Sequence, residues 1–510
     1  MKYYFTTPIY YINDLPHIGH SYTTLVADTL VRYHRLFGDE AFFLTGTDEH
    51  GQKAQEAAKK RGIEPQAHAD EMVVNYKNIW KELDIDYNLF IRTTDEFHKK
   101  GVQAALQQLY DAGEIYSQDY EGWYCVGDEI FYNEKDLVNG KSPTGRDVTL
   151  VKEKNYFFKM SKYQDKLIKH FESNPQSILP DYRRNEVLGF LRKPLEDLCI
   201  SRPKSRLTWG VEIPFDKDYV TYVWFDALLN YCTGVGYQQK GKETEFNKWW
   251  NEAGAIHLIG KDILTTHTVY WFSMLMALGV KLPKTVFAHG WWLTENNEKM
   301  SKSSGGVTIK PLDVKNVVGV DAFRYYLNRD VSFGNDAKFS QDLVVSRFNS
   351  ELANNLGNLL SRSTNLIQKF FDAKVPAVDF SKEETKKLKE QALAAADLVK
   401  TEVESFNTQK AIGHIVDLLT EANKYLENQA PWKIAKTDLA AAAEPLVASL
   451  EVLRIAAILL SPVMPGKMKS LLETIGWNRP LGFSDAKTWG LTSPGTPVKK
   501  AEALFPRLMA

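Results

Sequence analysis

Two histidines stand three residues apart near the N-terminus of the chain. The segment His17-Ile18-Gly19-His20 follows a run rich in aromatic and β-branched residues and precedes a stretch with a helical pattern. Imidazole N–H groups can donate hydrogen bonds to phosphate oxygens, and a helix N-terminus favours anions. Gly19 would let a flat purine ring approach the backbone. The segment predicts a nucleotide site, although a loop with two surface histidines would show the same short pattern.

A second charged group lies in Lys299-Met300-Ser301-Lys302-Ser303, just before Gly305 and Gly306. Lysines on a mobile loop can close over a triphosphate and neutralise the charge that develops as pyrophosphate leaves. A solvated basic loop is the simpler explanation for one such run. The presence of both segments, each after a predicted strand, favours chemistry on a nucleotide triphosphate.

The elements that must position these residues alternate between strand-like and helical patterns, which predicts an α/β fold with a doubly wound parallel sheet. We expect four strands at 3–7, 41–46, 255–260 and 285–289, and helices at 22–37, 52–61 and around 268–278. The segment 113–219 shows short strand-like pieces and no sustained helical period, and we interpret it as an inserted, lid-like α+β domain that splits the sheet. After about residue 340, long helical patterns predict a helical bundle.

Length and composition limit the possible classes of protein. A chain of 510 residues is longer than a single hydrophobic core usually supports, so several domains are expected. A content of 44% hydrophobic and 25% charged residues is typical of a globular protein. The formal net charge of −1 argues against indiscriminate nucleic-acid binding but allows a local basic surface. Cys125, Cys199 and Cys232 show no pairing pattern. We found no membrane segment or signal peptide and expect a cytoplasmic protein.

The segments 17–20 and 299–303, in this order, are the two signatures of class I aminoacyl-tRNA synthetases. Within that class the chain resembles methionyl-tRNA synthetases of the bacterial and organellar form. The matching stretches are Thr6 to Asn13, Phe43 to Gly51, Ile200 to Pro203, Tyr222 to Ala227 and Ile259 to Ile263. The resemblance implies activation of L-methionine with ATP and Mg²⁺, followed by transfer of the methionyl group to the 3′ end of tRNA(Met), initiator and elongator alike.

The resemblance also assigns roles to individual residues. The expected catalytic residues are His17, His20, Lys299 and Lys302. The expected ATP-binding residues are His17, Gly19, His20, Gly260, Asp262 and Lys302, with the segment 286–290 near the adenine. Activation needs no general base, because the methionine carboxylate attacks the α-phosphate directly and catalysis consists of positioning and electrostatic stabilisation.

A methionine pocket must be apolar, adaptable and able to contact a thioether, and aromatic rings meet these needs. The resemblance places this pocket at Ile9, Tyr11, Trp224, Ala227, Leu228, Tyr231, Ile263, His267 and Trp271. It adds Asp48 for the methionine ammonium group, and Arg202 as the partner of that acid and of the methionine carboxylate. Core packing is the usual role of any single aromatic residue, and a structural salt bridge is the competing explanation for Asp48 and Arg202.

Many members of the family hold zinc in the insertion, which requires about four Cys or His ligands. Here Cys125 remains without the other three, so no zinc and no other bound metal is expected. For the tRNA anticodon the resemblance implies Asn358, Arg362 and Trp432; Asn358 and Arg362 are four residues apart on one predicted helix. A packed core tryptophan is the alternative for Trp432.

The expected domains follow from these assignments. They are a catalytic domain in two halves (1–112 and 220–291), an inserted connective domain (113–219), a stem-contact region (292–350) and a helical anticodon-binding domain (351–510). Two alternatives stay open at this point: another class I synthetase, or a synthetase-derived RNA-binding module without catalysis. We expect a monomer without an obligate protein partner.

Overall fold

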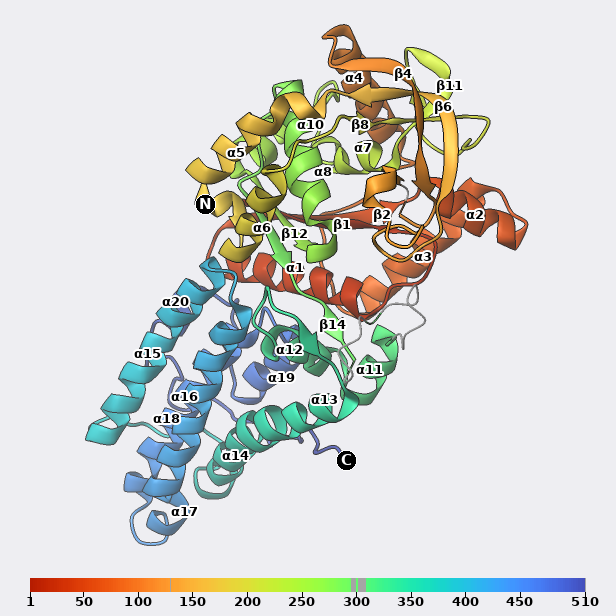
Figure 1. The fold of residues 1–510 in the computed structure, drawn as a ribbon. Coiled ribbons are helices and arrows are strands. Elements are labelled where there is room, and N and C mark those ends of the chain that lie inside the picture. Colours follow the sequence, from red (N-terminus) through yellow and green to blue (C-terminus); the bar gives the residue numbers. More distant parts are fainter. Residues whose placement is uncertain (129, 295–299, 301–308, 510) are drawn as a thin grey trace.

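The computed structural model describes residues 1–128, 130–294, 300 and 309–509 (Figure 1). Its centre is a six-stranded parallel sheet in the order β3-β2-β1-β12-β13-β7. The strands are β1 (Lys2–Tyr11), β2 (Glu40–Asp48), β3 (Leu89–Arg92), β7 (Ile178–Leu179), β12 (Ala255–Gly260) and β13 (Thr285–His289). The strand order reverses between β1 and β12, and ligands of doubly wound sheets bind outside the carboxyl ends of the strands at such a point. The α/β fold class is therefore confirmed.

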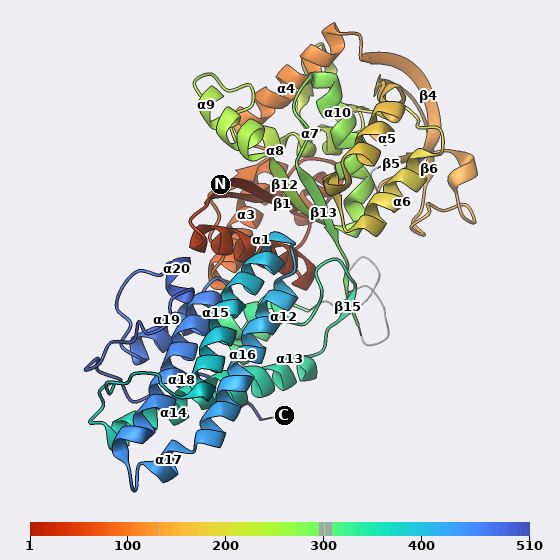
Figure 2. The same ribbon diagram turned by 90° about the vertical axis from the view of Figure 1, so that its left-hand side faces the viewer.

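Helices cover the sheet and connect its strands (Figure 2). They are α1 (Ile18–Leu36), α2 (Gln52–Arg61), α3 (Pro65–Glu82), α4 (Glu96–Asp111), α7 (Val223–Leu228), α8 (Asn230–Thr233), α9 (Glu243–Phe246), the π-helical η4 (Asn247–Ala253), η5 (Lys261–Ile263), the π-helical η6 (Thr266–Tyr270) and α10 (Trp271–Leu278). The predicted limits of α2, β12 and β13 match the structure. Helix α1 begins four residues before the predicted start, because His17 is its N-cap and its ring accepts a hydrogen bond from the Gly19 N–H.

The inserted segment has the α+β composition that the sequence analysis predicts. It contains a four-stranded antiparallel sheet and a three-stranded one, together with two helices of 10 and 11 residues. Its elements are β4 (Ile115–Cys125), β5 (Ile130–Tyr132), η1 (Glu134–Asp136), β6 (Thr149–Phe158), η2 (Met160–Tyr163), α5 (Gln164–Ser173), η3 (Pro175–Ser177), α6 (Asp181–Leu191), β8 (Leu198–Cys199), β9 (Ser201–Pro203), β10 (Glu212–Ile213) and β11 (Asp216–Thr221). Helices α5 and α6 each bury only two side chains, which explains why the sequence showed no sustained helical period there. Strand β7, also within 113–219, pairs with β13 in the main sheet.

The second half of the chain forms the predicted helical bundle, below the sheet in Figure 1. Its elements are β14 (Trp292–Leu293), α11 (Pro311–Val318), α12 (Val320–Arg329), β15 (Ala337–Lys338), α13 (Gln341–Arg347), the π-helical η8 (Phe348–Gly357), α14 (Asn358–Phe370), α15 (Glu383–Glu404), α16 (Thr408–Gln429), α17 (Pro431–Ile434), α18 (Leu439–Leu460), α19 (Pro465–Thr474) and α20 (Phe483–Ala486). Helix α18 is buried on all sides from Ala442 onward, as expected for the central helix of a bundle. Among the described helices none has both the length and the apolar character needed to cross a membrane.

One buried arginine ties the bundle to the helix that carries the two histidines. Arg324 on α12 is fully buried, and its Nη2 lies 2.6 Å from the carboxylate of Asp28 on α1. Its remaining N–H groups donate to the backbone oxygens of Leu83, Asp84, Pro462 and Val463. Because a buried charge is tolerated only with such complete pairing, this contact fixes α1 against the bundle.

Candidate active site

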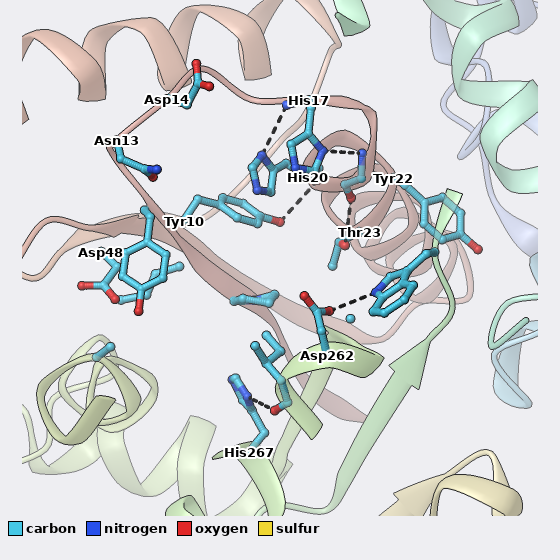
Figure 3. A pocket seen from close by; sticks show the side chains of 18 of the residues that line it. Tyr10, Asn13, Asp14, His17, His20, Tyr22, Thr23, Asp48, Asp262 and His267 are labelled. Atoms are coloured by element: carbon cyan, nitrogen blue, oxygen red, sulfur yellow. Dashed lines mark hydrogen bonds between the residues drawn. The ribbon is translucent and has the colours of Figure 1, made fainter. Parts of the chain in front are cut away.

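A cavity of about 590 Å³ opens at the carboxyl ends of β1, β2, β12 and β13 (Figure 3). Fourteen of the predicted site residues line it: Ile9, Tyr11, His17, Gly19, His20, Asp48, Trp224, Ala227, Leu228, Tyr231, Gly260, Asp262, Ile263 and His267. The chain brings them together from segments more than 200 residues apart, as expected for strand ends that meet at one edge of a parallel sheet.

The two N-terminal histidines lie against each other at the start of α1, with ring centroids 3.9 Å apart (Figure 3). The Nδ1 atom of His17 accepts a hydrogen bond from the Gly19 N–H at 3.0 Å, and the Nδ1 atom of His20 accepts one from the His17 N–H at 3.3 Å. A ring nitrogen that accepts a hydrogen bond carries no proton, so in the neutral rings the proton is on Nε2. Both imidazoles are thus held in the tautomer that can donate from Nε2.

His289, at the end of β13, lines the side of the cavity that also holds Thr23 and Asp262. Its Nδ1 lies 2.7 Å from the Gly290 carbonyl oxygen, which can only accept, so Nδ1 is protonated and Nε2 accepts from Thr23 Oγ1 at 2.7 Å. Burial lowers the pKa of His289 to about 4. Nearby, Asp262 Oδ1 accepts a hydrogen bond from the Trp291 indole at 3.2 Å. This side therefore combines neutral histidine with a carboxylate.

The opposite side of the cavity is aromatic. His267 donates from Nδ1 to the Ile263 carbonyl oxygen at 2.9 Å and accepts the Tyr231 hydroxyl proton on Nε2 at 2.8 Å. Burial lowers the pKa of His267 to about 4, so the ring is neutral at pH 7. The Trp224 ring stands edge-on to both Tyr11 and His267, at centroid distances of 6.4 and 6.0 Å. These rings form an apolar wall with few polar groups.

Two predicted methionine-site residues do not line the cavity. Trp271 is completely buried behind Tyr231, and its indole N–H donates to His257 Nε2 at 3.2 Å. A π-helical turn precedes α10, so Trp271 does not share the direction that α-helical spacing from His267 predicts. Arg202 is 3% exposed and packs its guanidinium on the rings of Tyr124, Phe131 and Tyr222. Packing within the insertion keeps it out of the cavity lining.

Several lining residues were missed by the sequence analysis. They are Pro8, Tyr10, Asn13, Asp14, Leu15, Ile18, Tyr22, Thr23, Lys53, Gly127, Arg146, Asn230, Trp291, Trp292 and Met300. His289 and Gly290, which also line the cavity, belong to the segment 286–290 that the sequence analysis expected near the adenine. The spacing of α1 could have indicated Thr23, four residues after Gly19, whereas strand alternation from Ile9 and Tyr11 places Tyr10 on the opposite face and could not have indicated it. Only the folded insertion brings Arg146 to the cavity, and no sequence pattern indicated it.

The predicted catalytic residues Lys299 and Lys302 lie outside the described residues. Met300, between them, is described. It is 5% exposed, lines the cavity, and donates its backbone N–H to the Trp292 carbonyl oxygen at 3.3 Å.

The three predicted anticodon residues come together at the end of the bundle. The Arg362 guanidinium lies 4.9 Å from the centroid of the half-buried Trp432 ring and pairs with Glu427 at 2.6 Å. Asn358, one turn before Arg362, is exposed and donates to Asn423 Oδ1 at 3.3 Å. The group therefore presents an aromatic ring, a cation and an amide toward solvent.

The insertion around Cys125 is held by hydrogen bonds. Asp128 accepts from Thr144 at 2.7 Å and from Arg146 at 3.0 Å, while Cys125 is buried beside it. Burial raises the pKa of the Cys125 thiol. Within the described part of the chain there is no group of three or more His, Cys, Asp or Glu side chains that could hold a metal ion.

Comparison with known proteins adds independent evidence. The family model "tRNA synthetases class I (M)" matches residues 3–149 and 133–364, and the model "Anticodon binding domain of methionyl tRNA ligase" matches residues 375–509. The methionine--tRNA ligase of Caldanaerobacter subterraneus subsp. tengcongensis is 45% identical over 99% of this chain and 79% of its own. This chain belongs to the methionyl-tRNA synthetase family.

Further relatives agree with this assignment. The methionine--tRNA ligase of Rickettsia conorii is 44% identical over 94% of this chain and 93% of its own. A solved Mycobacterium tuberculosis methionyl-tRNA synthetase in complex with methionyl-adenylate superimposes with a TM-score of 0.94, at 38% identity, over 99% of this chain and 100% of that chain. The predicted family and the predicted enzyme class, an ATP-dependent methionine--tRNA ligase, are confirmed. The two alternatives, another class I synthetase and a silent RNA-binding module, are set aside.

Proposed function

We propose that the cavity binds methionine and ATP together, forms methionyl-adenylate, and passes the methionyl group to the 3′ end of tRNA(Met). The observation that carries the proposal is the division of one cavity into two chemically different ends. One end presents the Nε2 donors of His17 and His20 at a helix N-terminus, which suits phosphate. The other end is walled by Trp224, Tyr231 and His267, which suits a thioether.

In the activation step, the methionine carboxylate oxygen attacks the α-phosphorus of ATP. A carboxylate–phosphorus bond forms, the bond to the bridging oxygen breaks, and pyrophosphate leaves with that oxygen. No proton has to be removed from the nucleophile, so rate acceleration comes from positioning and from stabilising charge on the phosphates. His17 and His20 would donate to phosphate oxygens, and Lys299 and Lys302 would neutralise the departing pyrophosphate.

The remaining lining residues would hold the two substrates. Asp48, at the end of β2, would accept hydrogen bonds from the methionine ammonium group, with Ile9, Tyr11, Trp224, Ala227, Leu228, Tyr231, Ile263 and His267 around the side chain. Gly19, Gly260 and Asp262 would face the nucleotide, with Asp262 placed for the ribose. Arg202 and Trp271 do not line the cavity, so neither would contact the substrates directly in this arrangement.

Mg²⁺ would enter with the nucleotide. This ion is usually held by substrate phosphates and one or two carboxylates, and Asp14, Asp48 and Asp262 all line the cavity. Strong chelation followed by addition of Mg²⁺ should therefore restore full activity. Elemental analysis should find no stoichiometric zinc; one zinc per chain would contradict our interpretation of Cys125.

For the tRNA we propose that Asn358, Arg362 and Trp432 contact the anticodon. Aromatic rings stack on unpaired bases, while arginine and asparagine supply charge and hydrogen bonds. Initiator and elongator tRNA(Met) share their anticodon, so both are expected substrates. We propose the same domain bounds as the sequence analysis, with residues 351–510 as the anticodon-binding domain. We also propose a cytoplasmic location.

The sharpest test of the active site uses Lys302→Ala, with Lys310→Ala as the control, since Lys310 is an exposed lysine eight residues further on. The first substitution should slow single-turnover formation of methionyl-adenylate by roughly 30- to 1,000-fold, equivalent to about 2–4 kcal/mol of transition-state stabilisation. Methionine binding at equilibrium should change little, because the lysine acts when pyrophosphate leaves. An unchanged single-turnover rate would remove Lys302 from the mechanism.

A further inference from the structure

A buried aspartate between two histidines lies beside the methionine end of the cavity, and the proposed reaction does not use it. Asp226 Oδ2 accepts a hydrogen bond from His50 Nδ1 at 2.6 Å, and its Oδ1 accepts one from His98 Nε2 at 2.8 Å. Asp226 and His98 are fully buried and His50 is 4% exposed. A carboxylate in such a place needs a reason, because burial of a charge is costly unless every oxygen is paired.

The three side chains come from three elements that surround the methionine end. Asp226 lies on α7 between Trp224 and Ala227, which both line the cavity. His50 follows β2, two residues after the lining residue Asp48. His98, on α4, stands behind them. The Asp226 carboxylate therefore joins the segment that carries Asp48 to the helix that forms the thioether wall.

Helix α4 is packed closely enough to complete this contact. His98 Nδ1 lies 2.7 Å from Thr233 Oγ1 on α8, the helix that also carries Tyr231. A Cβ atom at Gly101 would come within 2.5 Å of the Thr233 side chain, so only glycine permits this approach. Thus α4, α7, α8 and the end of β2 meet at one charged group.

The surroundings of Asp226 favour the charged form of its carboxylate. Burial raises the pKa of Asp226, but the charge of His50 and the hydrogen bonds from His50 and His98 outweigh burial, and the pKa is lower than its ordinary value. Removal of the charge would leave two buried imidazoles with altered hydrogen bonding. A hydrogen-bonded carboxylate is also directional, unlike an apolar contact, so it holds its partners at a defined separation.

We propose that Asp226 is a positioning residue for methionine, which holds the Asp48 segment and helix α7 at a fixed separation. That separation sets the distance between the group that binds the substrate ammonium and the wall that receives the thioether. It thereby selects an amino acid of the length of methionine. This inference rests on the proposed role of Asp48.

The test compares Asp226→Asn with Glu451→Gln in methionine-dependent exchange of pyrophosphate into ATP. Glu451 is an equally buried carboxylate in the bundle, paired with Arg454 at 2.7 Å and with the backbone N–H groups of Gly490 and Thr492. Asp226→Asn should raise KM for methionine by roughly 10- to 100-fold, with a smaller change in kcat and KM for ATP, since a misplaced wall weakens substrate positioning. It should also reduce the preference for methionine over ethionine, a thioether one methylene longer. Glu451→Gln should lower the melting temperature but leave KM for methionine and the preference for methionine over ethionine unchanged.

A histidine pair provides a second test in case Asp226→Asn does not fold. The amide nitrogen of asparagine can replace the Nδ1–H donor, so His50→Asn should retain near-normal KM for methionine, whereas His50→Ala should raise it. Equal values for these two variants, or an Asp226→Asn protein with unchanged KM and ethionine discrimination, would overturn the proposal. Asp48→Asn is measured in parallel. If it also leaves KM for methionine unchanged, the site assignment itself fails; if it alone raises KM, only the role of Asp226 is wrong.

Discussion

The end of the cavity proposed to bind methionine and the group of Asn358, Arg362 and Trp432 in the bundle both combine aromatic rings with polar groups, but in opposite environments. Tyr231 and His267 are at most 1% exposed, and each of their polar atoms has a defined partner. At the bundle, the side chains of Arg362 and Glu427 are 29% and 63% exposed. A buried hydrogen bond is costly to lose, whereas an exposed ion pair contributes little and is readily exchanged for another partner. The first arrangement suits a small substrate that must fit one shape, and the second suits RNA that replaces existing contacts.

The largest expected difference between the two regions is in pH dependence. The pKa values of His267 and His289 are about 4 in the folded protein, against an ordinary value of 6.5. The unfolded chain therefore binds more protons below pH 6.5, so stability is complete above that pH and is lost as the pH falls toward 4. Once a histidine is fully protonated in the folded protein, it should have lowered the free energy of unfolding by about 3 kcal/mol.

Urea unfolding at pH 7, 6, 5 and 4.5 measures this effect. His267→Gln should remove part of the pH dependence between pH 6.5 and 5, where ordinary carboxylates scarcely titrate. His414→Gln in the bundle is the matched control, because the His414 side chain is 31% exposed. Stability that stays constant from pH 7 to 5 would show that the buried histidines are more accessible than their hydrogen bonds indicate.

Trp432→Ala sharpens the comparison at the RNA side. The ring is half-buried and covered on one face by Arg362, so its removal should lower the melting temperature only slightly. If the ring stacks on an anticodon base, about 1–3 kcal/mol of tRNA recognition is lost, which lowers aminoacylation kcat/KM roughly five-fold to over a hundred-fold. Methionine activation without tRNA should be unchanged. Parallel losses in both activities, with a strongly lowered melting temperature, would place Trp432 in the core instead.

The smallest effect is expected for Glu427→Gln. Its carboxylate lies 2.6 Å from Arg362, the same distance that separates Asp28 from Arg324, but the second pair is fully buried. Glu427→Gln should change the free energy of unfolding by less than about 1 kcal/mol. Asp28→Asn, measured alongside it, should cost about 3–5 kcal/mol, because it leaves a buried guanidinium uncompensated. Equal losses of unfolding free energy for the two variants would show that the exposed and buried ion pairs do not differ in strength.

Several parts of the active site could be predicted before the structure was known because their signals are local. Strand limits at β12 and β13 follow from short apolar runs, and the two histidines stand where a helix begins. The predicted lining residues Trp224, Ala227, Leu228 and Tyr231 share one short segment, so a single family match places all four. Residues such as Tyr10 and Thr23 were missed because each carries an ordinary pattern for its own element.

By itself, the sequence determined the family, the alternation of strands and helices, and most of the residues at the strand ends, because these depend on residues close together in the chain. Only the tertiary structure decided which side of an element faces the cavity. A π-helical turn directs Trp271 into the core, the packing of the insertion encloses Arg202, and β7 leaves the insertion to join the main sheet. The joining of His50, His98 and Asp226 is the clearest case, since their hydrogen bonds span up to 176 residues. Such contacts result from the competition of many distant partners for burial, and no local pattern encodes that outcome.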